Sequence, residues 1–298
     1  MKVSVVIPCY NTAELLRKNL PLVLVASQNP GNNIGEVIVV DDASTDGSAD
    51  VVKKEFPQIR LIKHRVNRGF SAAVNTGARM AKGELICLLN TDVIPEKNFL
   101  EAAIAHFNRK EVFAVSFHEK DYSWAKGDFR EGYLSHSMGK ESLEAHPSLW
   151  ANGGSALFRR DYWMALGGMD EKLFTPFYWE DMDLSYRAYK RGFVVLWEPN
   201  ARVEHKHEST MGQLSKSYIQ RIRERNELFF IWKNITSPNL FRKHIAALFT
   251  RMFRHPGYLR VVFLAILKVG IIIMARRKER KEATVSDETL FARFAGGF

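Results

Sequence analysis

Short apolar runs alternate with helix-period segments through the first two-thirds of this chain, and this alternation constrains the fold most strongly. The run at residues 3–8 is rich in β-branched residues and stops at Pro8, as expected for a strand buried on both faces. Comparable runs follow at residues 36–40, 84–89 and 112–117, with helical segments between them. Strands and helices that alternate through short connections predict the α/β class, with a parallel, doubly wound sheet and right-handed crossovers.

Three segments carry expectations about less regular parts of the chain. Pro95 is placed at the first position of a helix that runs to about Asn108, because proline is favoured there. Residues 118–149 are charged and aromatic without a clear period, and we interpret them as a long loop or excursion over the site. A strand at residues 193–198 is expected to stop before Pro199.

Polar residues follow three of the predicted strands directly. Tyr10 follows the first strand, Asp42 follows the second, and Asn90 and Asp92 follow the strand at residues 84–89. Ligands of open α/β sheets bind at the carboxyl ends of the strands. These side chains are therefore predicted to converge on one edge of the sheet, where they would form a binding site.

A cluster of three acids opens a later segment of helical period. Glu180, Asp181 and Asp183 stand within four residues of one another. The first turn of a helix tolerates acids, because its N–H groups are unpaired and the dipole favours negative charge. Three acids exceed what capping needs, which favours a functional site over the alternative of a solvated acidic turn.

Two of these positions have the residue types of a metal site. Asn90 and Asp92 place an amide and a carboxylate two residues apart, which suits a hard divalent cation that also holds phosphates. The alternative is an Asx-turn that ends the strand. His205 follows a further strand and offers an imidazole ligand. The alternative is that His205 is an ordinary polar residue at the surface.

Other polar and glycine positions admit both a functional and a purely structural interpretation. Asp42 offers an acceptor for a nucleobase N–H, or caps a helix. Arg68 precedes a helical segment and is placed to contact phosphate, or lies in a solvated loop. Gly153 and Gly154 let a backbone approach a sugar closely, or form a plain turn.

In this order and at this spacing, the motifs resemble those of the family 2 glycosyltransferases of GT-A fold, closest to their rhamnosyltransferase-like branch. The resemblance covers about residues 1–210. The matching segments lie at residues 3–11, 39–46, 67–77, 88–92, 154–161, 167–171, 179–184 and 203–205. The resemblance implies a GT-A (Rossmann-like) mixed, mainly parallel sheet flanked by helices.

The resemblance also implies an activity. It predicts an inverting glycosyltransferase that moves a hexosyl or deoxyhexosyl group from a UDP-, GDP- or dTDP-linked sugar to an acceptor hydroxyl on a glycan or lipid. The product would belong to a cell-surface polysaccharide, the cell wall or a glycolipid. On the donor side, Pro8 and Tyr10 would border the nucleobase, Asp42 would hydrogen-bond it, and Arg68 would lie near the diphosphate.

The same resemblance assigns the metal, the base and the acceptor side. Asp92 and His205 would bind Mg²⁺ or Mn²⁺, beside Asn90 at the position where the family usually has a first aspartate. Asp181 would be the general base. The acceptor-side candidates are Trp150, Asn152, Gly153, Gly154 and Glu180.

The net charge of +10 is concentrated near the C-terminus. Residues 1–215 carry a net charge of −1, whereas residues 216–281 carry 16 basic and 3 acidic residues. Such a shift in composition indicates a boundary near residues 210–216. We therefore expect a catalytic domain at residues 1–210 and a basic, partly apolar helical appendage at residues 211–298.

The appendage contains a strongly apolar stretch at residues 258–275, which Arg260 and Lys268 interrupt and basic residues flank. We expect this helix to lie on the cytoplasmic face of an anionic cell membrane, as in a peripheral or monotopic protein. The alternative is a helical subdomain that packs Phe263 and Leu267, with Leu264, on the catalytic core.

Two other classes of function are alternatives to the transferase. The first is a non-catalytic, degenerate transferase fold whose basic tail binds lipid or nucleic acid. The aromatic residues of the tail stand among leucine, isoleucine and valine, which disfavours a nucleic-acid partner because base stacking needs exposed rings. The second is a dinucleotide-dependent dehydrogenase, which lacks support because no Gly-x-Gly-x-x-Gly follows the first strand.

Overall fold

The structure is a computed structural model that describes residues 1–205 and 215–295. Within these ranges nine strands form one sheet, in the order β3-β2-β1-β4-β10-β6-β11-β5, and β9 pairs with β11. These strands are β1 (Val3–Cys9), β2 (Ile34–Asp41), β3 (Arg60–Lys63), β4 (Leu85–Leu89), β5 (Val93–Pro95), β6 (Val112–Glu119), β9 (His146–Pro147), β10 (Ser155–Arg159) and β11 (Val194–His205). Neighbouring pairs from β3 to β4 are parallel, as are β6 and β11, whereas β10, β5 and β9 are antiparallel to their neighbours. The expected mixed, mainly parallel sheet is confirmed.

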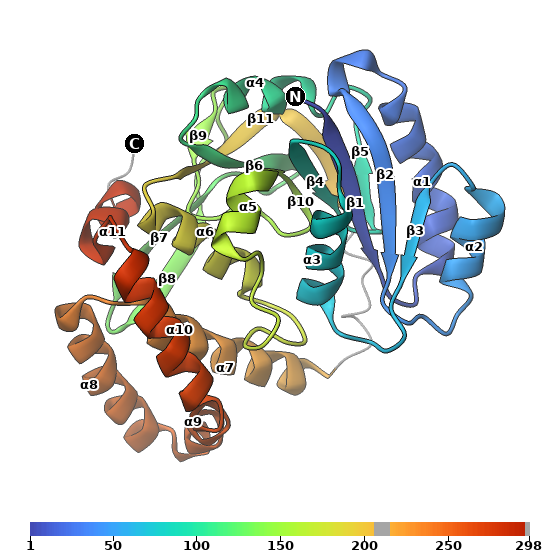
Figure 1. Ribbon diagram of the computed structural model, residues 1–298. Coiled ribbons are helices and arrows are strands. Elements are labelled where there is room, and N and C mark those ends of the chain that lie inside the picture. Colours follow the sequence, from blue (N-terminus) through green and yellow to red (C-terminus); the bar gives the residue numbers. More distant parts are fainter. Residues whose placement is uncertain (206–214, 296–298) are drawn as a thin grey trace.

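Helices cover both faces of this sheet (Figure 1). One face packs against α1 (Ala13–Ser27), α2 (Ser48–Glu55) and α4 (Glu101–Ala105), and the other against α3 (Phe70–Met80), α5 (Arg160–Leu166) and α6 (Glu180–Lys190). Alternate residues of β1 serve the two faces, since Val5 and Ile7 belong to the first core and Val6 to the second. This division follows from the period of two along a strand.

The direction of the strands decides where the polar residues meet. The parallel strands end at one edge of the sheet, and β10, which runs the opposite way, begins there. The Gly153–Gly154 pair before β10 therefore lies at the same edge as the residues that follow β1, β2 and β4. Convergence at a carboxyl edge, expected from the sequence, is confirmed.

The expectation of a long loop at residues 118–149 was wrong in part. This segment contains β7 (Ala125–Arg130) and β8 (Tyr133–Met138), which pair as an antiparallel hairpin, and also β9. In β7 the odd-numbered residues from Ala125 to Phe129 are buried and their neighbours are more exposed, a strand pattern that the charged composition obscured. Glu131 and Gly132 turn the hairpin with positive φ angles of 49° and 81°, as hairpin turns require.

Both expectations that placed a boundary at proline were wrong. Pro95 ends β5 instead of opening a helix, and α4 begins only at Glu101. Because β5 is an edge strand paired with β11, a residue without an N–H is tolerated there. β11 in turn continues through Pro199 to His205, with a shift in its pairing register between Glu198 and Arg202 that accommodates the proline.

The helices after residue 215 share a core with the sheet. They are α7 (Lys216–Asn234), α8 (Pro238–Arg254), α9 (Leu259–Ile266), α10 (Val269–Glu282) and α11 (Asp287–Ala295). Phe229 and Phe230 of α7 and Phe291 of α11 are buried in the same cluster as α3 and α6. The division at residue 210 rests on composition, and packing continues across it. Phe263 and Leu267 are 61% and 65% exposed, so the alternative was wrong for these two side chains, although α9 does pack on the core through Val261 and Ala265.

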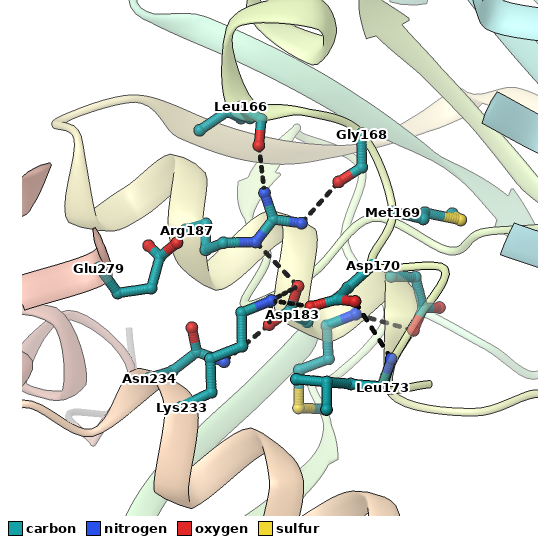
Figure 2. Close-up of polar contacts among 12 residues, drawn as sticks. Leu166, Gly168, Met169, Asp170, Leu173, Asp183, Arg187, Lys233, Asn234 and Glu279 are labelled. Carbon is teal, nitrogen blue, oxygen red and sulfur yellow. Dashed lines mark hydrogen bonds and ion pairs between the residues drawn. The ribbon is translucent and has the colours of Figure 1, made fainter. Parts of the chain in front are cut away.

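A buried carboxylate, that of Asp183 on α6, joins α6 to α7 (Figure 2). It accepts hydrogen bonds from Arg187 Nε at 2.8 Å, Lys233 Nζ at 2.9 Å and Asn234 Nδ2 at 2.8 Å. Lys233 Nζ also donates to Asp170 Oδ2 at 2.8 Å, and Arg187 donates to backbone carbonyls of the 166–168 turn. Burial would raise the pKa of Asp183, but the charges of Arg187 and Lys233 outweigh it and lower that pKa. The network therefore holds an ionised carboxylate in the interior.

Replacing Lys233 with methionine is expected to lower the free energy of unfolding by about 3–5 kcal/mol, because the substitution removes the cation that the buried carboxylate of Asp183 shares with Asp170. Chemical denaturation measures this difference. The matched control is Lys82→Met, at an exposed lysine, which is expected to change stability by less than about 0.5 kcal/mol. Equal effects of the two substitutions would show that the network does not hold α7 in place.

Candidate active site

A cavity of about 610 Å³ opens at the carboxyl edge of the sheet. Its lining contains most of the residues that the sequence singled out: Pro8, Tyr10, Asp42, Asn90, Asp92, Asn152, Gly153, Gly154, Glu180 and Asp181. Residues that are far apart in the chain thus share one space, as the strand directions require. The lining also includes Phe177 and Tyr178 and, from α7, Tyr218.

The carboxylate of Asp42 is 3% exposed and is engaged within the chain. Its oxygens lie 2.6 Å from His64 Nδ1 and accept from the backbone N–H groups of Arg68 at 2.9 Å and Gly69 at 2.7 Å. Asp42 therefore fixes the loop that leads into α3. Its hydrogen bond to a nucleobase stays a prediction, since these contacts use much of its capacity to accept.

Three predicted site residues, Arg68, Trp150 and His205, are not part of the cavity wall. The guanidinium of Arg68 pairs with Glu171 Oε2 at 2.9 Å. The Trp150 ring packs edge-on against His136, with centroids 5.3 Å apart. Contact of Arg68 with phosphate and of Trp150 with an acceptor would need these side chains to move.

His205 lies between two carboxylates at the end of β11. Its Nε2 is 3.2 Å from Asp92 Oδ1, and its Nδ1 is 3.1 Å from Glu119 Oε2. Burial opposes the charged imidazolium, but the hydrogen bonds that its ring N–H groups donate to Asp92 and Glu119 outweigh it and raise the pKa of His205 to about 9. A metal ion held by His205 must therefore displace a proton.

The fit of a divalent cation rests on Asp92. Its Oδ2 atom is buried and has no hydrogen-bond partner among the described residues, although buried polar atoms are normally paired. Across residues 1–205 and 215–295, no set of three or more His, Cys, Asp or Glu residues is arranged to hold a metal ion by itself. Among the described residues, Asp92 and His205 thus offer two ligands that fit a divalent cation.

Sequence reasoning missed Glu119, which supports this pair from behind. Glu119 is 3% exposed, and its Oε1 accepts from Asn152 Nδ2 at 2.8 Å and from the hydroxyl of Ser155. It is the last residue of β6, a strand whose carboxyl end lies at the site edge. The sequence could have shown Glu119, because extending the predicted strand at residues 112–117 by two residues places it at the site edge.

The acids at the start of α6 divide into two roles. Asp183 belongs to the buried network, whereas Glu180 and Asp181 line the cavity. Asp181 Oδ2 accepts from the Gly153 N–H at 3.1 Å and Oδ1 from the Met182 N–H at 2.8 Å. Burial raises the pKa of Asp181 despite these bonds. Burial and the neighbouring charge of Asp181 raise the pKa of Glu180 well above its usual range.

The two glycines before β10 lie so close to Asn90 and Asp181 that little room is left for a side chain. A Cβ on Gly154 would lie 2.3 Å from Asn90 Nδ2, so any side chain there would displace the Asn90 amide. The Asn90 N–H donates to the Gly154 carbonyl at 2.9 Å. Gly153 lies against the Cβ of Asp181 and orients its carboxylate. The pair is thus more than a plain turn, because it joins the Asn90 and Asp181 sides of the cavity.

Helix α7 holds the segment that leads into α6. Tyr178 and Trp179 have positive φ angles of 72° and 77°, which cost about 1–3 kcal/mol each for such residues unless the surroundings hold them. The fully buried Asn226 donates through Nδ2 to the carbonyls of Phe177 at 2.9 Å and Tyr178 at 3.0 Å. Arg223 of α7 stacks on the Tyr178 ring at 4.2 Å. No local sequence signal pointed to these contacts.

Comparison with known proteins gives a consistent result. A family model described as "Glycosyl transferase family 2" matches residues 4–166. The chain is 32% identical to the glycosyltransferase GlyG of Streptococcus pneumoniae over 130 residues. This alignment covers 43% of this chain and 42% of that protein. It is 24% identical over 254 residues to the N-acetylglucosaminyl-diphospho-decaprenol L-rhamnosyltransferase of Mycobacterium tuberculosis, covering 72% of this chain and 79% of that protein. The chain thus spans less than half the length of GlyG.

A solved structure supports the fold. The mannosyltransferase PcManGT from Pyrobaculum calidifontis, in complex with GDP-Man and Mn²⁺, superposes with a TM-score of 0.57 at 19% identity. The superposition covers 99% of this chain and 86% of that one. The likeness shows a shared fold.

Replacing Glu180 with glutamine is expected to stabilise the protein increasingly as pH rises. Below the unfolded-state pKa of this carboxyl both states hold its proton, and the substitution changes little. Above it the unfolded chain releases the proton while the folded state, whose pKa is raised, resists, so the wild type loses stability.

Melting temperatures from about pH 4 to about pH 8 test this difference. The exposed Glu144→Gln serves as the control. If the melting temperature of Glu180→Gln rises above that of the wild type by less at high pH than at low pH, the raised pKa of Glu180 is contradicted.

Proposed function

The chain belongs to glycosyl transferase family 2, with the GT-A fold, and from this premise we propose that it transfers a sugar from a nucleotide-diphosphate sugar to an acceptor hydroxyl. The observation that carries the proposal is the shared cavity. Tyr10, Asp92 and Asp181, which come from three separate motifs, line the same 610 Å³ space. A base and a site for the leaving diphosphate in one cavity are what such a transfer needs.

The donor is proposed to lie along the carboxyl ends of β1 and β2. Tyr10 is partly exposed in the cavity beside Pro8 and can stack on a nucleobase. Asp42 shapes this end through the loop it fixes, and Arg68 on that loop is proposed to contact the diphosphate once its side chain leaves Glu171. UDP-, GDP- and dTDP-linked sugars are all donors to test.

A divalent cation, Mg²⁺ or Mn²⁺, is proposed to bind Asp92 and His205 beside Asn90. The support is the buried, unpartnered Oδ2 of Asp92, and the PcManGT structure was solved with Mn²⁺. When bound, such an ion supplies positive charge that offsets the charge of a departing diphosphate. Glu119 would keep the His205 ring oriented through Nδ1, as outer carboxylates do for histidine ligands.

Asp181 is proposed as the general base of an inverting displacement. Its carboxylate takes the proton of the acceptor hydroxyl while that oxygen bonds to the anomeric carbon and the bond to the nucleoside diphosphate breaks on the opposite face. The raised pKa of Asp181 makes it a better base than an ordinary aspartate. The N–H groups of Gly153 and Met182 hold the carboxylate in place, which limits reorientation during proton transfer.

The acceptor is proposed to approach from the side of Asn152, Gly153, Gly154 and Glu180, with Phe177, Tyr178 and Tyr218 beyond them. Aromatic rings suit the apolar faces of sugars. A glycan or lipid-linked acceptor, and a role in cell-surface polysaccharide or glycolipid synthesis, agree with the relative from M. tuberculosis.

Asp181→Asn is expected to lower the rate of sugar transfer by at least about a hundredfold, because the amide cannot take the acceptor proton. Donor binding should stay near that of the wild type. Transfer rates and a thermal shift with the donor measure the two effects separately. Asp50→Asn, at an exposed aspartate of α2, is the control. A variant that loses donor binding together with transfer would require another role for Asp181.

Asp92→Ala is expected to abolish the part of donor binding that depends on Mg²⁺ or Mn²⁺. A panel of donors, screened by thermal shift with and without each metal ion, measures this and identifies the nucleobase. An Asp92→Ala protein that responds to donor and metal like the wild type would exclude Asp92 as a ligand.

A further inference from the structure

The outer faces of α8, α9 and α10 carry a group of exposed apolar side chains. We call this group the apolar outer surface, and its members are Phe249, Phe253, Leu259, Phe263, Ile266, Leu267, Val269, Ile273 and Met274. Phe253 is 89% exposed. Single exposed apolar residues are ordinary, but a cluster of large ones marks a surface that meets a partner.

The spacing shows that α9 is apolar on both sides. Leu259, Phe263 and Ile266 fall on one stripe at helical spacing and face outward. Val261 and Ala265 fall on the far side of the helix and are buried in the core shared with α7. A helix that needed only to cover the core would have a polar outer face, so the outer stripe serves a second contact.

α9 is a helix of 8 residues, and the helix that follows it is strongly bent relative to it. In the described ranges no single helix is both long and apolar enough to cross a membrane. The segments 256–266 and 269–282 meet that test only together, and they are bent by 70° relative to each other.

Basic side chains accompany the apolar outer surface. Arg254, Arg260, Lys268, Arg277 and Lys278 are exposed on the same three helices or at their ends, and within the described ranges none of them forms an ion pair. Unpaired cations beside apolar side chains complement the anionic headgroups and acyl chains of a lipid surface. A protein partner with a plain apolar patch would leave these charges uncompensated.

We propose that the apolar outer surface docks the protein onto a bilayer that contains anionic lipid, with its apolar side chains in the interface and the neighbouring arginines and lysines on the headgroups. In Figure 1, α8, α9 and α10 lie at the lower left, and α7 runs from them toward the lower ends of the strands. Tyr218 near the start of α7 lines the candidate active site. One helix thus joins the docking surface to the cavity.

Flotation with vesicles tests the proposal on the full chain. The wild type is expected to float with vesicles of phosphatidylcholine and phosphatidylglycerol in equal parts, and to bind vesicles of phosphatidylcholine alone at least about tenfold more weakly. Phe263→Ser/Leu267→Ser is expected to bind the anionic vesicles at least about tenfold more weakly than the wild type. Arg277→Glu/Lys278→Glu should do the same while keeping the apolar side chains.

The matched control is Leu22→Ser/Val25→Ser, at exposed apolar residues of α1 on the other side of the sheet. It should float like the wild type, and circular dichroism should show all variants folded. The proposal is overturned if the wild type stays in solution with both kinds of vesicle, or if both test variants float as well as the control. A wild type that dimerises through this surface without binding vesicles, as seen by sedimentation, also overturns it.

Discussion

The position of the candidate active site depends on one buried carboxylate. Asp183 is fully buried and would be strongly disfavoured as an ion without its partners. Arg187 of its own helix and Lys233 and Asn234 of α7 supply the compensating charge and hydrogen bonds. Because every partner must stay in place for the charge to be tolerated, the network fixes α6, α7 and the turn at residues 166–168 as one unit.

This constraint gives the acidic start of α6 two functions within one turn. Asp183 faces the interior and anchors the helix, while Glu180 and Asp181 face the cavity. The anchored helix then tolerates carboxyls whose burial raises their pKa. One turn thus carries a carboxylate fixed by buried partners and two carboxyls with raised pKa values, and such perturbed groups are typical of functional sites.

The C-terminal helices take part in the site as well as in the core. Asn226 of α7 holds the strained backbone before Glu180, and Tyr218 reaches the cavity wall. Further along, α9 has an outer apolar stripe that the core does not use. A segment that stands apart by its charge is therefore joined to the site at one end and carries the proposed docking surface at the other.

The sequence by itself determined β1, β2, β4 and β6, the polar residues that follow β1, β2 and β4, and the motifs at residues 8–11, 41–42 and 90–92, because period and turn chemistry are local. It also placed Tyr10, Asp42 and Asp92 near one edge, since parallel strands end together. Tertiary structure decided what local rules cannot. Pro95 became a strand end through pairing with β11, and residues 125–138 became a hairpin. It also separated Asp183 from Asp181 through partners 50 residues away on α7, because a buried charge is decided by its neighbours in space.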